Sequence, residues 1–219
     1  MPDEVSGALF DTWFADQHLM VILRGLTPER TVEACVKAWE LGITQVEVPI
    51  EPDDARESLE AAIEAGVRVG RLVGAGTVTR IEQVRFAARA GASFTVAPGI
   101  DEEVVRACAE HGLPHLPGVA TAGEIQRAHA LGCDWVKAFP ASVLGSDWVR
   151  AMLGPFPGLK VVATGGMHVD TVGAFLGAGA RVVALGSSLQ DPVQLNMLAR
   201  MLDGSLVAEG IDGHSSSPA

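Results

Sequence analysis

Cysteine, lysine and long apolar runs are all scarce in this 219-residue chain. The three cysteines, Cys35, Cys108 and Cys133, stand singly, which indicates neither a disulfide framework nor a cysteine zinc site. No segment approaches the roughly 20 apolar residues that a membrane helix requires. No cationic stretch followed by an apolar run begins the chain. We therefore expect an unprocessed, cytoplasmic protein that does not enter a membrane.

Positive charge is also scarce, because 16 lysines and arginines face 27 acidic residues and the formal net charge is −11. Nucleic acids and anionic membranes are bound by concentrated cationic surfaces, so we expect neither as a partner. A small anionic ligand is compatible with this charge. Backbone N–H groups at helix starts can hold such a ligand without a positively charged protein.

Motifs for metals and nucleotides are missing as well. The histidines show neither HxH nor HExxH spacing, and there is no Walker loop and no GxSxG elbow. We therefore expect no metal and no cofactor. The six histidines are His18, His111, His115, His129, His168 and His214.

Short β-rich runs alternate about eight times with stretches of helical period. The predicted strands are Met20–Arg24, Gln45–Ile50, Arg71–Gly76, Ser93–Ala97, His115–Val119, Asp134–Phe139, Lys160–Thr164 and Arg181–Leu185. Helices are expected to begin near Pro28, Asp53, Arg80, Asp101, Thr121, Ser146, Val169 and Pro192. Glycines close several of these helices, at Gly42, Gly66, Gly91, Gly112, Gly132 and Gly179.

This alternation predicts an α/β protein with a parallel sheet, most simply a single (β/α)8 TIM barrel over residues 1–209. A doubly wound open sheet is the alternative. The segment Glu4–Asp16 is expected to form an extra helix that plugs the amino-terminal end of the barrel. Residues 210–219, rich in Gly and Ser, are expected to form a disordered tail. In either architecture chemistry belongs at the carboxyl ends of the strands.

One of the three lysines is placed to act as a nucleophile. Lys37 belongs to a helix and Lys160 opens a strand, whereas Lys137 stands late in an apolar strand. An ammonium group in such surroundings is costly unless it has a task or a partner. A desolvated lysine amine attacks carbonyl carbons and forms imines. The alternative is that Lys137 belongs to a structural ion pair.

Glu47 is the natural partner for this lysine, because it interrupts the apolar strand Gln45–Ile50. Imine formation needs a group that moves protons on and off the reacting oxygens, and a carboxylate in an apolar lumen can do so. A purely structural role, in which Glu47 only holds Lys137, is the alternative.

Other strand ends carry groups suited to an anionic substrate. Arg24 can clamp a carboxylate, unless it forms an ordinary surface salt bridge, and Thr77 can donate a hydrogen bond. Gly74 and Gly76 would let a substrate approach the backbone. The loops after the last two strands are those that bind phosphate in barrel enzymes. Their residues are Gly165, Gly166, Gly186 and Ser187, for which plain turn glycines are the alternative.

Together these motifs resemble the 2-keto-3-deoxy-6-phosphogluconate (KDPG) aldolases, also called 4-hydroxy-2-oxoglutarate (KHG) aldolases. The similarity runs from about Val21 to about Leu189. It is carried by Ile22-Leu23-Arg24-Gly25, Val46-Glu47-Val48, Gly74-Ala75-Gly76-Thr77-Val78, Ala97-Pro98-Gly99, Pro117-Gly118-Val119-Ala120-Thr121, Val136-Lys137-Ala138-Phe139-Pro140, Gly154-Pro155-Phe156, Thr164-Gly165-Gly166 and Gly186-Ser187.

The resemblance implies a class I aldolase that needs no cofactor, and a homotrimer. It implies that Lys137 forms the imine and that Glu47 shuttles protons. It further implies that Arg24 and Thr77 surround the carboxylate of the 2-keto acid, that Pro98 and Phe139 line the pocket, and that Gly165, Gly166, Gly186 and Ser187 bind phosphate. The expected reaction cleaves KDPG to pyruvate and glyceraldehyde 3-phosphate.

Two positions bear on the substrate. Some members carry arginine where this chain has Glu51. A cationic contact from this position to the far part of the substrate is therefore not expected here. Relatives that cleave the galactonate epimer tend to carry valine where this chain has Thr164. We therefore expect Thr164 to contact the substrate, and its identity favours the gluconate form. The same chemistry on the galactonate epimer or on 4-hydroxy-2-oxoglutarate is the alternative. More distant alternatives are a phosphosugar isomerase or epimerase and a non-catalytic phosphometabolite-binding barrel.

Overall fold

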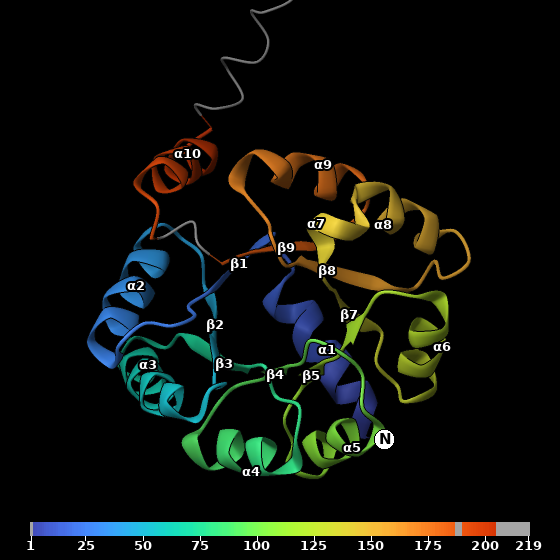
Figure 1. Cartoon of the computed structure of the whole chain (residues 1–219), viewed down its shortest axis with the longest axis horizontal. Helices are drawn as coiled ribbons and strands as arrows, with labels where there is room; N and C mark the ends of the chain where they lie inside the picture. Colours follow the sequence, from blue (N-terminus) through green and yellow to red (C-terminus); the bar gives the residue numbers. More distant parts are fainter. Residues whose placement is uncertain (1, 187–189, 205–219) are drawn as a thin grey trace, which may run out of the picture.

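The strands form one nearly closed parallel barrel (Figure 1). We describe residues 2–186 and 190–204 of a computed structural model, so the expected tail lies outside the described residues. The strand order is β5-β4-β3-β2-β1-β9-β8-β7-β6. The strands are β1 (Leu19–Ile22), β2 (Gln45–Pro49), β3 (Leu72–Gly76), β4 (Thr95–Val96), β5 (His115–Leu116), β6 (Gly118–Val119), β7 (Trp135–Ala138), β8 (Lys160–Thr164) and β9 (Val182–Leu185).

The count of nine strands and the expected eight describe the same barrel, because β5 and β6 are two halves of the predicted strand His115–Val119. Pro117 separates them, and proline has no backbone N–H to donate to a ladder. β5 pairs with β4 and β6 pairs with β7, so the interrupted strand still bridges its neighbours on both sides. The barrel prediction is confirmed, and the doubly wound alternative is wrong.

Helices surround the barrel and begin within a few residues of the predicted positions (Figure 1). The outer elements are α2 (Pro28–Glu40), η1 (Asp53–Ala55), α3 (Arg56–Val69), α4 (Ile81–Ala90), α5 (Glu102–Glu110), α6 (Ala122–Ala130), α7 (Ala141–Leu144), α8 (Ser146–Leu153), η2 (Val169–Thr171), α9 (Val172–Gly177) and α10 (Pro192–Leu202). Within the part of the chain that the structure describes, none of the helices has the length and apolar character needed to cross a membrane.

The predicted helix ends are correct with one exception. Positive φ angles follow the helices at Gly42, Gly91, Gly112, Gly132 and Gly179. The expected end at Gly66 is wrong, because α3 continues to Val69 and ends at Gly70, where φ is 66°. Gly66 is instead required by close packing, since a Cβ atom there would lie 2.8 Å from the carbonyl oxygen of Arg71.

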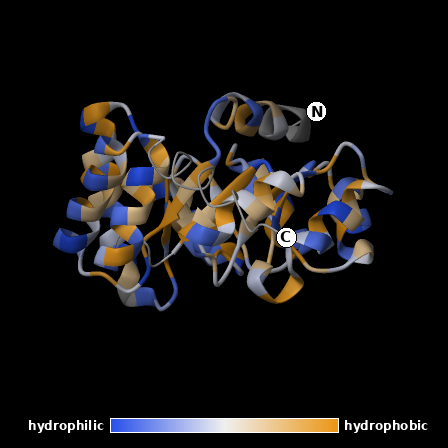
Figure 2. Ribbon diagram, turned by 90° about the horizontal axis from the view of Figure 1, so that it is seen from above, coloured by the Kyte–Doolittle hydropathy of each residue, from blue (hydrophilic) through white to orange (hydrophobic). Residues whose placement is uncertain are grey.

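The extra amino-terminal helix, α1 (Pro2–Trp13), lies across one end of the barrel (Figure 2). Phe10 of α1 and Phe14, which comes directly after the helix, are buried in the same apolar cluster as the lumen residues. The ring centroids of Phe14 and Trp135 are 5.3 Å apart. Asp11 Oδ2 lies 2.6 Å from Nζ of Lys160, the first residue of β8. This contact places α1 at the amino-terminal face and confirms that it plugs that end.

Candidate active site

Lys137 and Glu47 meet inside the barrel. On β7 the side chains of Trp135 and Lys137 face the lumen while Val136 packs outward, as the twofold alternation of a strand requires. On β2 Glu47 points inward in the same way. Lys137 Nζ lies 3.9 Å from Glu47 Oε1, and the two side chains are 5% and 0% exposed.

Among the described residues, neither oxygen of the buried Glu47 carboxylate has a hydrogen-bond partner. The 3.9 Å separation from Lys137 exceeds hydrogen-bond length, so this is not the tight, fully satisfied geometry that a structural buried ion pair needs. Buried polar groups are normally satisfied, and one left free is costly. Such a group in a cavity is a candidate for proton transfer.

Glycines on β3 create the room for this carboxylate. A Cβ atom on Gly76 would lie 2.1 Å from Glu47 Oε1, and one on Gly74 would lie 2.2 Å from the ring of Phe94. Both glycines face the lumen, where larger side chains already fill the space. Their explanation is therefore the packing of Glu47 and Phe94, a role that the sequence prediction of substrate approach had missed.

A cavity of about 370 Å³ opens onto Lys137 and Glu47 at the carboxyl ends of the strands. It is lined by Ile22, Arg24, Glu47, Lys137, Phe139, Thr164, Gly165, Gly166, Met167, His168, Ala184, Gly186 and Gln190. The ammonium of Lys137 lies 5.1 Å from the centre of the Phe139 ring, within the range of a cation–π contact. The volume suits a small metabolite.

Arg24 and Thr77 meet at the mouth of this cavity. Arg24 Nη2 donates to Thr77 Oγ1 at 2.9 Å. Arg24 is exposed, and no carboxylate of the described residues forms an ion pair with it, so the surface salt bridge is not found there. Thr77 is not among the residues that line the cavity, and it contacts the lining residue Arg24.

Pro98 is the predicted pocket residue that the structure places outside this cavity. It follows β4, and its carbonyl oxygen would lie 2.2 Å from a Cβ atom on Gly118. Pro98 is half-buried. Its contact with substrate stays a prediction.

The glycine loop after β8 also lines the cavity. Gly165 and Gly166 have φ angles of 98° and 68°, a region that favours glycine. Cβ atoms there would lie 2.8 Å from the Phe139 ring and 2.3 Å from Ser142 Oγ, respectively. These glycines are required by packing as well as by the turn. Gly186 also lines the cavity, whereas the predicted Ser187 lies outside the described residues.

Thr164 ends β8 beside the two glycines. It is 2% exposed and lines the cavity, and its hydroxyl has no hydrogen-bond partner among the described residues. A free hydroxyl of this kind can donate to a ligand oxygen. Thr164 is thus the second unsatisfied polar side chain that faces the cavity, after Glu47.

Several lining residues were missed by the sequence analysis. His168 is exposed at the cavity, two residues after Gly166, and Met167 and Gln190 lie near it on the lining. The histidines were searched only for metal spacing. Only His168 lies within three residues of the predicted phosphate loop, and that position is the signal that would have found it. In the described part of the chain no three His, Cys, Asp or Glu side chains are grouped to hold a metal.

Comparison with known proteins decides the family. The profile of the KDPG and KHG aldolases matches residues 18–201. The chain belongs to this family. It is therefore an aldolase, a lyase that breaks carbon–carbon bonds, as the motifs had predicted.

Relatives of this aldolase are named for more than one substrate. The 2-dehydro-3-deoxy-phosphogluconate aldolase of Treponema pallidum (strain Nichols) is 39% identical over 77% of this chain and 81% of the relative. The probable 2-dehydro-3-deoxy-6-phosphogalactonate aldolase of Rhizobium meliloti (strain 1021) is 36% identical over 81% and 84%. A solved structure described as native KDPGal is 32% identical, covers 90% of this chain and 96% of its own, and has a TM-score of 0.76.

Proposed function

We propose that this aldolase cleaves KDPG to pyruvate and glyceraldehyde 3-phosphate through an imine on Lys137. The observation that carries the proposal is the pairing of a nearly buried lysine with a carboxylate, 3.9 Å away, that has no hydrogen-bond partner among the described residues, in a cavity that Arg24 and the Gly165–Gly166 loop also line. A buried amine beside a free proton carrier is what imine chemistry requires.

The steps follow from these two groups. The amine of Lys137 attacks the C2 carbonyl carbon, and Glu47 gives a proton to the hydroxyl that leaves the carbinolamine as water. The resulting iminium withdraws electrons from C3. Removal of the proton from the C4 hydroxyl then breaks the C3–C4 bond and releases glyceraldehyde 3-phosphate. The remaining enamine takes a proton at C3, and water hydrolyses the iminium to pyruvate and free lysine.

Two groups on the cavity lining are suited to the two anionic groups of KDPG. Arg24, with Thr77 behind it, can bind the carboxylate through paired guanidinium N–H groups. The loop of Gly165 and Gly166, together with Gly186, offers backbone N–H groups to the phosphate. Ser187, which the resemblance adds to this group, lies outside the described residues. Thr164 and Phe139 also line the cavity.

The substrate choice is tested by comparing kcat/KM for KDPG, its galactonate epimer and unphosphorylated 4-hydroxy-2-oxoglutarate. We propose KDPG because Thr164 stands where relatives that cleave the galactonate epimer tend to carry valine. The phosphate should favour KDPG over the unphosphorylated acid by at least about tenfold, the effect of roughly 1.4 kcal/mol. A higher kcat/KM for the galactonate epimer would assign that substrate instead.

The imine itself is tested by intact mass and peptide mapping after incubation with pyruvate and borohydride. We expect a reduced pyruvyl adduct on Lys137 and loss of turnover in Lys137→Ala. Lys160→Ala is the matched control, because Lys160 pairs with Asp11 at the opposite end of the barrel. Aldolase activity in Lys137→Ala would show that Lys137 does not form the imine. The absence of an adduct on the wild-type protein would favour an isomerase, epimerase or binding protein.

We also propose that the aldolase is a homotrimer, a proposal that rests on the family resemblance. Light scattering coupled to size-exclusion chromatography should give three times the mass of the chain. A monomer mass at micromolar concentration would refute it.

A further inference from the structure

Thr77 is held in a backbone conformation that its side chain disfavours. Its φ angle is 58°, in the left-handed region that β-branched residues rarely adopt. Such a conformation persists only when the surrounding structure determines it from several sides. Because Thr77 Oγ1 accepts the hydrogen bond from Arg24, whatever fixes Thr77 also fixes the guanidinium at the mouth of the cavity.

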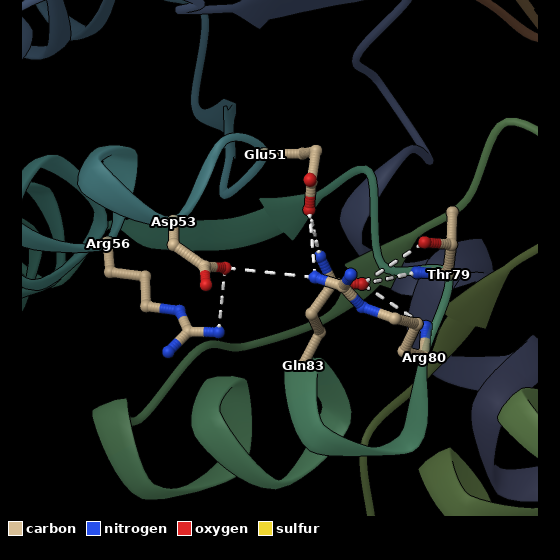
Figure 3. A network of polar contacts seen from close by, with 6 residues as sticks. All are labelled: Glu51, Asp53, Arg56, Thr79, Arg80 and Gln83. Atoms are coloured by element: carbon tan, nitrogen blue, oxygen red, sulfur yellow. Dashed lines mark hydrogen bonds and ion pairs between the residues drawn. The ribbon is translucent and has the colours of Figure 1, made fainter.

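A buried glutamine on α4 holds the chain that follows Thr77. Gln83 is 0% exposed, and its Oε1 accepts from the backbone N–H groups of Thr79 at 2.8 Å and Arg80 at 3.1 Å. The Thr79 hydroxyl lies 3.3 Å from the same oxygen (Figure 3). One side chain thus satisfies two backbone donors of the loop between β3 and α4.

The other end of the Gln83 amide reaches the loop after β2. Its Nε2 donates to Glu51 Oε2 at 2.6 Å, and Arg80 Nη2 lies 3.2 Å from that oxygen (Figure 3). Glu51 stands four residues after Glu47. The loops that follow the Glu47 strand and precede α4 are therefore joined through Gln83 and Glu51.

Exposed ion pairs also link the loops after β2 and before α4, but they stabilise this connection less than Gln83 does. Arg80 lies 3.7 Å from Asp53, and Asp53 lies 2.9 Å from Arg56 (Figure 3). These side chains are at least one third exposed, so solvent screens their attraction. The buried Gln83 has no such screening, and its loss would leave two backbone donors without their partner.

We propose that Gln83 and Glu51 are positioning residues for the substrate carboxylate. They hold the loop that directly follows Thr77, Thr77 holds Arg24, and neither Gln83 nor Glu51 touches the substrate. The proposal rests on the proposed function, because it assumes that Arg24 binds the carboxylate of the keto acid. It gives Glu51 a task here that differs from a distal substrate contact.

The test compares trapping of pyruvate with trapping of its neutral amide, which lacks the carboxylate. For each ligand we would measure the concentration that gives half-maximal borohydride-trapped adduct on Lys137. We expect Gln83→Glu to raise this concentration about tenfold for pyruvate, the effect of losing one charge-assisted contact. The half-saturating concentration of the amide and the maximal amount of adduct should stay within about twofold of the wild-type values, because the variant leaves Lys137 and Glu47 unchanged.

Two further variants keep the test informative if Gln83→Glu folds poorly. Glu51→Ala changes a residue whose side chain is 42% exposed and should shift the pyruvate value in the same direction. The double variant E51Q/Q83E exchanges the two groups, so an amide at position 51 can donate to a carboxylate at position 83. We expect the exchange to restore the pyruvate value to within about threefold of wild type, because the hydrogen bond is re-formed with its polarity reversed.

Gln45→Glu is the matched control. Gln45 is also a buried glutamine, 3% exposed, but its Nε2 donates to the Trp13 carbonyl at the amino-terminal face. Its variant should leave the ratio of the two half-saturation values unchanged. Equal shifts for pyruvate and the amide, no shift for pyruvate, or failure of the exchange to restore binding would overturn the positioning role. A wild-type protein that traps no pyruvate would overturn the proposed function, and this inference with it.

Discussion

At the scale of the residue, Glu47 shows how function departs from the rules of stable packing. Its carboxylate is fully buried and lies 3.9 Å from Lys137, and no residue in the described part of the chain forms a hydrogen bond with either oxygen. A structural role would place it in a short, satisfied pair. The space around it is kept open by Gly76, where any Cβ atom would collide with Oε1.

Glu47→Gln separates the catalytic role from the structural one. We expect kcat to fall by about 10²- to 10⁴-fold, the usual contribution of a general acid–base, while the free energy of unfolding changes by less than about 1 kcal/mol. If Glu47 merely held Lys137, the variant would instead lose about 3–5 kcal/mol of stability. Urea unfolding and steady-state kinetics on the same samples decide between them. Asp11→Asn, which breaks the Lys160 pair at the far end, is the control.

His168 offers a second test at this scale. It lies on the cavity lining beside Gly166, where an imidazole N–H can donate to the phosphate. We expect His168→Ala to raise KM for the phosphorylated substrate about three- to tenfold, the effect of losing a hydrogen bond worth about 0.5–1.5 kcal/mol. KM for unphosphorylated 4-hydroxy-2-oxoglutarate should not change. A parallel rise for both substrates would argue against a contact with phosphate.

At the scale of the element, α1 completes the core that the barrel strands leave open at the amino-terminal end. Phe10 is 1% exposed and contacts the rings of Phe94 and Trp135, with centroids 6.0 and 5.9 Å away. The strands alone would expose these lumen side chains. The helix is therefore part of the folded barrel and not an appendage.

Phe10→Ala measures this contribution. We expect the free energy of unfolding to fall by about 3–5 kcal/mol, as for other fully buried phenylalanines, with pyruvate trapping retained below the melting temperature because the cavity lies at the opposite face. Val67→Ala, on a residue that is 74% exposed, is the control and should change stability by less than about 0.5 kcal/mol. Equal effects of the two variants would show that α1 is not packed as described.

At the scale of the whole molecule, stability depends on a histidine outside the active site. His115 is buried, its Nδ1 lies 2.8 Å from Thr95 Oγ1, and Nε2 has no partner among the described residues. Burial lowers the pKa of His115 from 6.5 to about 4. The folded protein therefore keeps the ring neutral at pH values where the unfolded chain takes up a proton.

This difference in protonation makes the folded protein less stable at acid pH. The contribution of His115 is fully present above about pH 6.5 and is lost as the pH falls towards 4, because the unfolded state binds more protons there; the loss is roughly 3 kcal/mol. We expect His115→Gln to show a shallower fall in the free energy of unfolding between these pH values. Urea unfolding at several pH values tests this. Parallel curves for the two proteins would contradict it.

The sequence predicted the barrel because the relevant signals are local. Alternation of strand and helix, and glycines after helices, depend on neighbours within a few positions. The prediction failed where packing decides. Gly66 was placed at a helix end because a glycine can serve either a turn or a close contact, and only the structure brings the Arg71 carbonyl against it.

By itself, the sequence determined the fold class, the family and the strands that carry Lys137 and Glu47, since periodicity and ordered motifs are properties of the chain. Only the tertiary structure decided which side chains meet: that Gly76 makes room for Glu47, that Arg24 rests on Thr77, and that Gln83 joins two loops. The physical reason is that these contacts link residues from different strands and loops. Their distances are set when the parallel strands close into a barrel, and no local pattern records them.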